Sequence, residues 1–493
     1  MSVNIPFINE FSQLPEACFS RVLPTPVSQP TLVAFNHLLA DSLGISSEHD
    51  AGLAAVFSGN QVPANADPLA MAYSGHQFGH LNPQLGDGRA ILLGDVRDNR
   101  NQLRDIQLKG SGRTPYSRNG DGRSPLGPAM REYLLCEAMH ALGVPTTRAL
   151  ALVTTGDTVY RERREPGAVF TRVAASHIRV GTFQYLALRR DEESLRALAD
   201  HTLARHFPDI SPESESRYLE LFTEIVRQQA ELIARWMLLG FIHGVMNTDN
   251  MTVSGETIDY GPCAFMDNFS RSKVFSSIDQ QGRYAYQNQP AIGQWNLARL
   301  AEALLGLFPG DEDDAVAAAT QVLNDYSQWH QQAWESGMSE KLGLGTTAEQ
   351  DRQLAEDLLT LLEQGRIDYS HFFHALAQCT EQDADRTPLF LLIDPAIPGD
   401  ATRQQLEEWL NRWQDEVSNR TSPETAAQKM RSVNPAVIPR NHRIAEAINA
   451  GEQGDFSVFY ALADALRSPY QEHPEFSKGP RSGEEVLRTF CGT

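Results

Sequence analysis

Positive charge is scarce in this chain, and lysine is especially rare. Only five of its 42 basic residues are lysines, at positions 109, 273, 341, 429 and 478, and the other 37 are arginines. A lysine beside other chemically active residues is therefore informative. Acidic residues number 63, which gives a net charge of -21 and a pI near 5.1. Binders of nucleic acid or of anionic membranes need a basic face, so we expect neither kind of partner.

Cysteine is also scarce. The five cysteines are scattered, odd in number and never in C-x-x-C spacing: Cys18, Cys136, Cys263, Cys379 and Cys491. This pattern fits neither a disulfide scaffold nor a zinc site.

Long apolar runs and a basic N-terminus are missing. No apolar stretch approaches the roughly 18 residues that a membrane helix needs. The first basic residue is Arg21, so the N-terminus has neither the charged start of a secretory signal nor the arginines of a transit peptide. We therefore expect a cytoplasmic protein without a membrane partner, and we expect it to be a monomer.

Strand signals come first along the chain and helix signals later. Short strand-like runs at 89–96, 104–110, 148–156 and 168–174 surround one predicted helix at 129–143. After about residue 185 the apolar residues follow helical spacing, as in 218–241, although 255–267 again has strand character. The acidic stretch at 310–319 is typical of a helix N-terminus.

This order predicts an α+β protein with two lobes around a nucleotide. We expect an N-terminal extension over 1–80 and a strand-rich N-lobe with the nucleotide-binding loop over 81–185. A helical C-lobe with the catalytic and metal motifs would follow over 186–400. A helical C-terminal extension that carries the last cysteine would occupy 401–493.

The octapeptide "HGVMNTDN" at 243–250 resembles the protein-kinase catalytic loop His-Arg-Asp-Leu-x-x-x-Asn. The kinase Asp that accepts the substrate proton is replaced by Val245, while Asn250 keeps the metal-binding position. Nine residues further on stands Asp259 in an Asp-Tyr-Gly tripeptide, as the kinase Asp-Phe-Gly would. Because hard cations prefer oxygen ligands, Asn250 and Asp259 are candidate ligands of a divalent metal that bridges nucleotide phosphates.

Before the octapeptide, three features follow one another in the order found in kinases: a glycine pair, a lysine on a strand and a glutamate on a helix. Gly86 and Gly88 form a turn before a predicted strand, Lys109 ends the next strand, and Glu132 lies on the following helix. In kinases such a lysine contacts the phosphates and is held by the glutamate. Each residue alone is more often a plain turn or a solvated charge, but their order favours a nucleotide site.

Asp249 and two arginines each allow two interpretations. Asp249 is the only carboxylate in the octapeptide, so it is either a general base or an ordinary loop-capping residue. Arg172 and Arg179 either clamp a polyphosphate or form structural salt bridges.

Long stretches of the chain resemble the selenoprotein O family in its bacterial YdiU type. The matching stretches are "YSGHQFGHLNPQLGDGRAILLGDV" (73–96), "DIQLKGSGRTPYSRNGDGR" (105–123), "TRVAASHIRVGTF" (171–183), "HGVMNTDNM" (243–251), "TIDYGPCAFMD" (257–267) and "NPAVIPRNHRIAEAINAGEQGD" (434–455). The resemblance implies a protein-kinase-like two-lobed fold and transfer of AMP from ATP to Ser, Thr or Tyr hydroxyls of protein substrates, with release of pyrophosphate. Transfer of UMP from UTP is a related activity of bacterial members. The alternatives are a conventional protein phosphotransferase and an inactive nucleotide-binding scaffold.

The resemblance also implies a role for each matching residue. Asp249 would be the proton acceptor, Asn250 and Asp259 would hold Mg²⁺ or Mn²⁺, and Glu132 would pair with Lys109. The nucleotide would be bound by Gly86, Gly88, Arg89, Lys109, Asp121, Gly122, Arg172, Arg179 and Asp259.

Family members also carry a selenocysteine or cysteine near the C-terminus, linked to redox control through a disulfide with the segment after the Asp-Tyr-Gly motif. Cys491 matches the tail position, and Cys263 is the cysteine nearest that motif. The resemblance therefore raises a Cys263–Cys491 disulfide as a hypothesis. Two free thiols in a reducing cytoplasm are the alternative.

Overall fold

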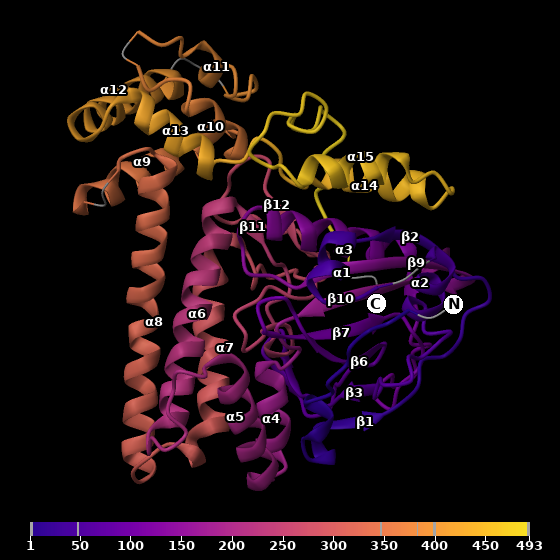
Figure 1. Cartoon of the computed structure of the whole chain (residues 1–493). Helices are drawn as coiled ribbons and strands as arrows, with labels where there is room; N and C mark the ends of the chain where they lie inside the picture. The colour runs from indigo at the N-terminus through magenta and orange to yellow at the C-terminus, as the bar shows by residue number, and fades with distance from the viewer. Residues whose placement is uncertain (1–2, 47–48, 346–347, 382, 398–400, 491–493) are drawn as a thin grey trace.

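A computed structural model describes residues 3–46, 49–345, 348–381, 383–397 and 401–490 of the chain. A strand-rich part lies beside a larger helical part, and helices of the C-terminal region extend back over the strand-rich part (Figure 1). This is a mixed α/β architecture. Cys491 lies outside the described residues.

An eight-stranded antiparallel sheet dominates the strand-rich part. Its order is β1-β3-β6-β7-β10-β9-β2, and β8 pairs with β10 beside this path. The strands are β1 (Phe19–Arg21), β2 (Thr31–Phe35), β3 (Leu69–Met71), β6 (Ala90–Arg97), β7 (Leu103–Lys109), β8 (Ser124–Pro125), β9 (Arg148–Tyr160) and β10 (Arg164–Ala174). Three of them come from the first 80 residues, which the sequence predicts as an extension. In the structure, strands of this predicted extension pair with strands of the predicted N-lobe, β3 with β6 and β2 with β9.

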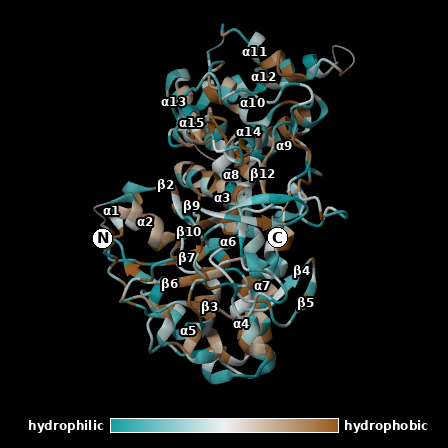
Figure 2. Ribbon diagram, turned by 90° about the vertical axis from the view of Figure 1, so that its right-hand side faces the viewer, coloured by the Kyte–Doolittle hydropathy of each residue, from teal (hydrophilic) through white to brown (hydrophobic). Residues whose placement is uncertain are grey.

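Helices cover both faces of this sheet. The helices α1 (His37–Ser42) and α2 (Asp50–Phe57) lie on one face, and α3 (Leu126–Ala141) lies on the other. Successive side chains of a strand point to opposite faces, so Leu93 packs in the cluster with α1 and α2, while Leu92 packs in the larger cluster with α3. Figure 2 shows hydrophobic segments in the sheet between the covering helices. The sheet is thereby buried on both sides.

The rest of the chain is mainly helical. Its helices are α4 (Val180–Leu188), α5 (Glu192–His206), α6 (Arg217–Leu239), α7 (Gln289–Leu304), α8 (Glu312–Lys341), α9 (Glu349–Gln364), α10 (Tyr369–Leu376), α11 (Thr387–Phe390), α12 (Ala401–Arg420), α13 (Pro423–Val433), α14 (Asn441–Gly451) and α15 (Ser457–Leu466). The long helix α6 ends at Gly240, whose φ of 68° suits glycine. The acidic stretch at 310–319 begins helix α8, as predicted. The Asp311 side chain caps this helix by accepting a hydrogen bond from the backbone N–H of Asp314.

The strand predicted over 255–267 is mostly wrong. Only β12 (Ala264–Phe265) forms there, and it pairs with the two-residue β11 (Phe241–Ile242). Asp259 has a φ of 63°, and such a left-handed residue cannot continue an extended strand. The apolar residues around it, such as Tyr260 and Met266, belong to the larger buried cluster that also contains residues of α3 and α6.

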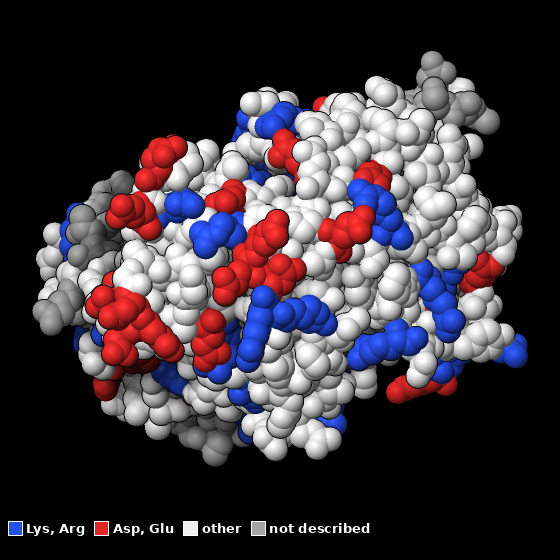
Figure 3. All heavy atoms as spheres, turned by 90° about the horizontal axis from the view of Figure 1, so that it is seen from below, with Lys and Arg blue, Asp and Glu red and all other residues white. Residues whose placement is uncertain are grey.

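The surface carries charges of both signs. On the face in Figure 3, acidic and basic side chains are interspersed. Within the described residues, none of the helices combines the length and the apolar character needed to span a lipid bilayer.

Candidate functional site

The octapeptide 243–250 follows β11, and the ring of its first residue, His243, holds it in place with two hydrogen bonds. The buried His243 accepts the backbone N–H of Val245 at Nδ1, 3.4 Å away, and its Nε2 lies 2.8 Å from the carbonyl oxygen of Ile258. A ring that accepts at Nδ1 carries its proton on Nε2, so His243 donates to Ile258. The histidine thereby fixes the octapeptide against the residue just before Asp259.

Asn250 at the end of the octapeptide is also held in place. Its side-chain nitrogen donates to the backbone carbonyl of Val245 at 3.0 Å. This bond uses the amide's nitrogen and leaves its oxygen as the atom that could bind a metal. Val245, where a kinase has its catalytic Asp, therefore contributes only its backbone to the site.

Asp259 is the meeting point of three cations. Its Oδ1 lies 3.0 Å from Lys109 Nζ and 2.6 Å from Arg172 Nη2, and its Oδ2 accepts from Arg179 Nη1. Lys109 ends β7, Arg172 lies on β10, and Arg179 precedes α4, so three elements converge on one carboxylate. The left-handed backbone at Asp259 turns the carboxylate towards them.

Glu132 on α3 completes this cluster. Its carboxylate lies 2.7 Å from Lys109 Nζ and also accepts from the guanidinium of Arg172. Burial raises the pKa of Asp259, but Arg172, Lys109 and Arg179 together hold it well below its usual value. Burial also raises the pKa of Glu132, but Arg172 and Lys109 lower it below its usual value, so both carboxylates are ionised within this cluster of three cations. Such a cluster is suited to a polyphosphate.

Asp249 is the one carboxylate of the octapeptide, and it lies with 8% exposure beside this cluster. Its backbone carbonyl accepts from Arg179 Nη1, while its side-chain Oδ2 lies 3.5 Å from the Gln77 amide nitrogen. Its Oδ1 has no hydrogen-bond partner among the described residues. Burial raises the pKa of Asp249 to about 6. A carboxylate with a free oxygen and a raised pKa has the properties of a general base.

A hairpin that the sequence did not connect with the site covers this octapeptide. It consists of β4 (Gly75–Gln77) and β5 (His80–Asn82). The N–H of His76 donates to Thr248 Oγ1 at 2.7 Å, and the N–H of Phe78 donates to Asn247 Oδ1 at 3.1 Å. These contacts join residues about 170 positions apart, so no local pattern indicates them.

The glycine turn at 86–88 packs against the loop that follows β7. Gly86 has a φ of 75°, and a Cβ on it would stand 2.3 Å from the ring of Tyr116. Thr114 Oγ1 donates to the carbonyl of Asp87 at 2.6 Å, and Ser117 Oγ donates to that of Gly88. The turn is thereby fixed in a form that only glycine allows at position 86. Arg89 follows it, half-buried, just before β6.

Asp87 between the two glycines is a site residue that sequence reasoning missed. Its buried carboxylate accepts from the N–H of Met71 and from the amide of Gln107, and it lies 3.9 Å from Arg179. Its place between two glycines of a candidate phosphate turn was the available signal. It adds a second carboxylate near Arg179, which faces Nη2 of the guanidinium while Asp259 accepts from Nη1.

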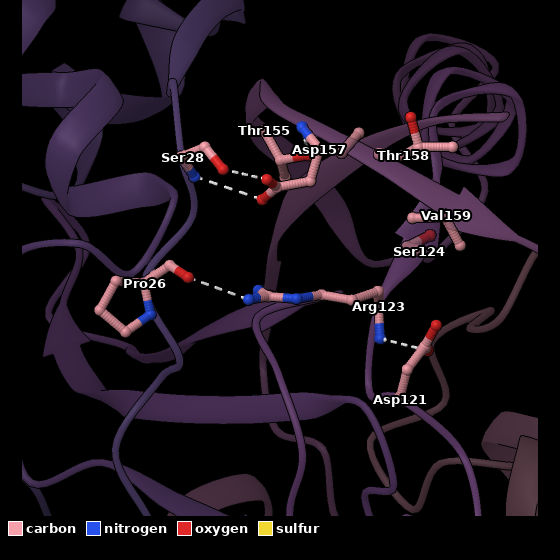
Figure 4. Close-up of a pocket in the computed structure, with 11 residues that line it drawn as sticks. Pro26, Ser28, Asp121, Arg123, Ser124, Thr155, Asp157, Thr158 and Val159 are labelled. Atoms are coloured by element: carbon pink, nitrogen blue, oxygen red, sulfur yellow. Dashed lines mark hydrogen bonds between the residues drawn. The ribbon is translucent and has the colours of Figure 1, made fainter.

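Asp121 and Gly122 lie in a different environment. Asp121 pairs with Arg161 at 2.9 Å and accepts the N–H of Arg123. Asp121 and Arg123 line a pocket of about 420 Å³, shown in Figure 4, where Arg123 donates to the carbonyl of Pro26. Gly122 has a φ of 71°, and a Cβ on it would collide with the backbone of Gly112 at 2.1 Å. The structure therefore places Asp121 in the lining of this pocket, whereas Lys109, Arg172 and Arg179 all contact Asp259.

Asn250 and Asp259 fit a metal that arrives with a nucleotide. Among the described residues, there is no cluster of three or more His, Cys, Asp or Glu side chains that could hold an ion alone. Mg²⁺ is usually bound by one or two carboxylates together with substrate phosphates and water. Two oxygen-bearing side chains beside a cluster of cations that is suited to phosphate match that donor set.

Cys263 is buried just after the Asp-Tyr-Gly motif, and burial raises the pKa of its thiol to about 12. The C-terminal tail reaches the same segment. The N–H of Thr489 donates to the carbonyl of Phe275 at 2.8 Å, and Thr489 Oγ1 donates to the carbonyl of Pro262. Thr489 therefore lies beside Pro262, the neighbour of Cys263, while Cys491 itself lies outside the described residues.

Comparison with known proteins agrees with these motifs. The model of the family described as protein adenylyltransferase SelO matches residues 1–467. A protein of Rhizobium meliloti (strain 1021) named protein nucleotidyltransferase YdiU is 55% identical over 493 residues, which cover 99% of this chain and 99% of that protein. A protein of Geobacillus kaustophilus (strain HTA426) with the same name is 53% identical over 495 residues, with the same coverage of both chains. The chain therefore belongs to the SelO family of protein adenylyltransferases.

Proposed function

We propose that this protein transfers AMP from ATP to a Ser, Thr or Tyr hydroxyl of a protein substrate and releases pyrophosphate. UMP transfer from UTP is the related reaction. One observation carries the proposal: the buried Asp249, with an unpartnered Oδ1, stands beside a cluster in which three cations surround Asp259. A base and a phosphate-binding cluster in contact are what nucleotidyl transfer requires. The names of the relatives support it.

In this proposal the acceptor hydroxyl gives its proton to Asp249 as its oxygen attacks the α-phosphorus. The bond between the α-phosphorus and the oxygen that leads to the β-phosphate breaks, and pyrophosphate leaves. Lys109, Arg172 and Arg179 neutralise phosphate charge, and Glu132 orients Lys109. A bound Mg²⁺ or Mn²⁺, held by Asn250 and Asp259, would supply further charge neutralisation at the phosphates.

The remaining predicted residues belong to the same proposal. The turn Gly86–Gly88 with Arg89 would approach the nucleotide through its backbone, and Asp121 and Gly122 would bind its more distant part. The proposal includes a protein-kinase-like two-lobed arrangement, with the N-lobe over 81–185, the C-lobe over 186–400, and extensions over 1–80 and 401–493. We further propose that the protein acts in the cytoplasm as a monomer.

The alternative functions are less well supported by the geometry. A conventional protein kinase has a proton-accepting Asp at the position of Val245, and valine cannot accept a proton. An inactive scaffold would bind nucleotide without needing a buried carboxylate with an unpartnered oxygen beside the cations.

ATP labelled at the α- or γ-phosphorus distinguishes the three functions. We expect α-label, and no γ-label, to become bound to an acceptor protein in the presence of Mg²⁺ or Mn²⁺. Transfer of γ-label would show a phosphotransferase, and transfer of neither label would show a scaffold. Asp259→Asn, which weakens the metal site, is the matched negative control, and labelled UTP tests the related donor.

A further inference from the structure

Two adjacent residues of the C-terminal region hold the segment that begins at Asp259. Arg440 is buried, with 1% of its side chain exposed, and donates to Asp267 Oδ1 and to Asp368 Oδ2 at 2.7 Å. Asn441 Oδ1 accepts from Arg131 Nη2 at 3.0 Å. Arg131 in turn donates to the carbonyls of Gly261, at 3.1 Å, and of Cys263. The segment 259–267 is thus held near both of its ends, about 175 residues away from Arg440 in sequence.

Arg131 connects this arrangement to the nucleotide site. It precedes Glu132 on α3, so successive residues of one helix contact the cation cluster and the backbone that follows Asp259. The three acceptors around its buried guanidinium are two backbone carbonyls and the amide oxygen of Asn441, all of them neutral. Burying a charge without an opposite charge is unfavourable. Such an arginine is therefore better explained by what it positions than by what it adds to stability.

The helix that carries Asn441 packs directly against α3. A Cβ on Gly127 of α3 would stand 3.0 Å from Cγ2 of Ile448, and one on Gly451 would stand 2.7 Å from Met130 of α3. The helices α14 and α15 lie along α3 in Figure 1. The C-terminal region therefore contacts both α3 and the segment after Asp259.

We propose that Arg440 and Asn441 are positioning residues of the transfer reaction, which fix Asp259 and Glu132 relative to each other through Arg131 and Asp267. The proposal rests on the proposed function. It assigns a role to the motif "NPAVIPRNHRIAEAINAGEQGD", which contains no residue of the nucleotide site.

Asn441→Ala tests this role, because it removes one of the three acceptors of Arg131 without touching the nucleotide site. Residues that orient metal ligands typically contribute about 10- to 100-fold to activity, so we expect kcat for α-label transfer to fall by that factor. We also expect faster hydrogen–deuterium exchange in residues 260–267 of the nucleotide-free protein. Asn441→Asp keeps an acceptor oxygen for Arg131 and should retain most of the activity and the slow exchange.

Ile448→Ala is the control, since it loosens the packing of α14 on α3 but leaves the Asn441–Arg131 bond. We expect it to lower the melting temperature while exchange in 260–267 stays slow. If Asn441→Ala does not fold, Arg131→Lys replaces it, because lysine keeps the charge but lacks the guanidinium fork. Unchanged exchange in the variant, or an equal loss of kcat in Ile448→Ala, would overturn the proposal. The exchange measurement needs no transfer activity. It therefore still tests the positioning role if the wild type transfers no label and the proposed function is wrong.

Discussion

Gly75 lies so close to Asp249 that a Cβ atom on it would stand 2.3 Å from Asp249 Oδ1. Real side chains do not approach this closely, so a larger residue at position 75 must displace the carboxylate or the hairpin β4–β5. The hairpin thereby limits where Asp249 can lie.

Gly75→Ala should lower the rate of transfer while nucleotide binding remains. A misplacement of about 1 Å at a reacting group can cost on the order of 100-fold in rate. The measurement is kcat for α-label transfer together with the Kd for ATP. Gly306→Ala is the matched control, because a Cβ there meets no atom within 4 Å. Equal activity of the two variants would show that Asp249 does not need its present position.

Asp249→Asn should abolish proton acceptance and keep the shape of the side chain. General-base catalysis contributes about 100- to 10,000-fold, so we expect kcat to fall by a factor in this range with little change in the Kd for ATP. Single-turnover kinetics and calorimetric titration measure the two quantities separately. Wild-type kcat in this variant would mean that another group takes the proton.

Metal should bind well only together with nucleotide. The Asp259 carboxylate is already shared by Lys109, Arg172 and Arg179, so a free metal ion would have to compete with three cationic side chains for it. We expect paramagnetic resonance to detect little Mn²⁺ binding to the protein alone and clear binding after a non-hydrolysable ATP analogue is added. Chelation by EDTA should stop α-label transfer.

Asp259→Asn should lose the nucleotide-dependent Mn²⁺ binding, and tight binding of Mn²⁺ to the nucleotide-free protein would contradict the prediction. The same variant leaves the buried Arg172 and Arg179 with a neutral partner. Removing one partner of a buried ion pair costs about 3–5 kcal/mol, so its melting temperature should also fall.

Glu256 should make the protein less stable as the pH rises. Burial raises the pKa of Glu256 from 4.5 to about 7, although Arg104 lies nearby and the N–H of Ala175 donates to the carboxylate at 2.8 Å. Between these two values the folded state keeps the proton and the unfolded state releases it, so stability is lost as the pH rises through about 7. A shift of this size corresponds to on the order of 3 kcal/mol.

Glu256→Gln removes this titration, so the difference in melting temperature between pH 5 and pH 8 should be smaller in the variant than in the wild type. The exposed Glu213, changed to Gln, is the control and should leave the difference unchanged. An identical difference in wild type and Glu256→Gln would show that Glu256 titrates normally.

The Cys263–Cys491 disulfide remains a hypothesis that thiol counting can decide. The tail approaches Pro262, so the pairing needs no large movement of the chain before Thr489. The burial of Cys263 means that its neighbours must open before it reacts. Non-reducing mass spectrometry of the oxidised protein should show two fewer free thiols than the reduced protein, and Cys491→Ser should abolish the difference. Equal counts in the wild type would exclude the disulfide.

Local patterns in the sequence were sufficient for the elements and for part of the site. The spacing of the octapeptide and Asp259, and the order of Lys109 and Glu132, are local or sequential features, and helical periodicity is visible wherever one face of a helix is buried. For this reason α3, α6 and the strands β6, β7, β9 and β10 lie close to where the sequence predicts them. The chain's membership in its family also came from contiguous motifs.

The tertiary structure alone decided what surrounds the reactive groups. Arg172 and Arg179 meet Asp259 across 87 and 80 residues, and the hairpin at 75–82 meets Asp249 across about 170. The strand predicted over 255–267 was mostly wrong for a related reason. A pattern of apolar residues shows that a segment is buried, but it does not show whether the buried segment is a strand. A local sequence specifies which conformations a segment favours. The contacts that raise the pKa of Asp249, lower that of Asp259 and bind Arg131 to Asn441 arise only when distant segments exclude water from the same space.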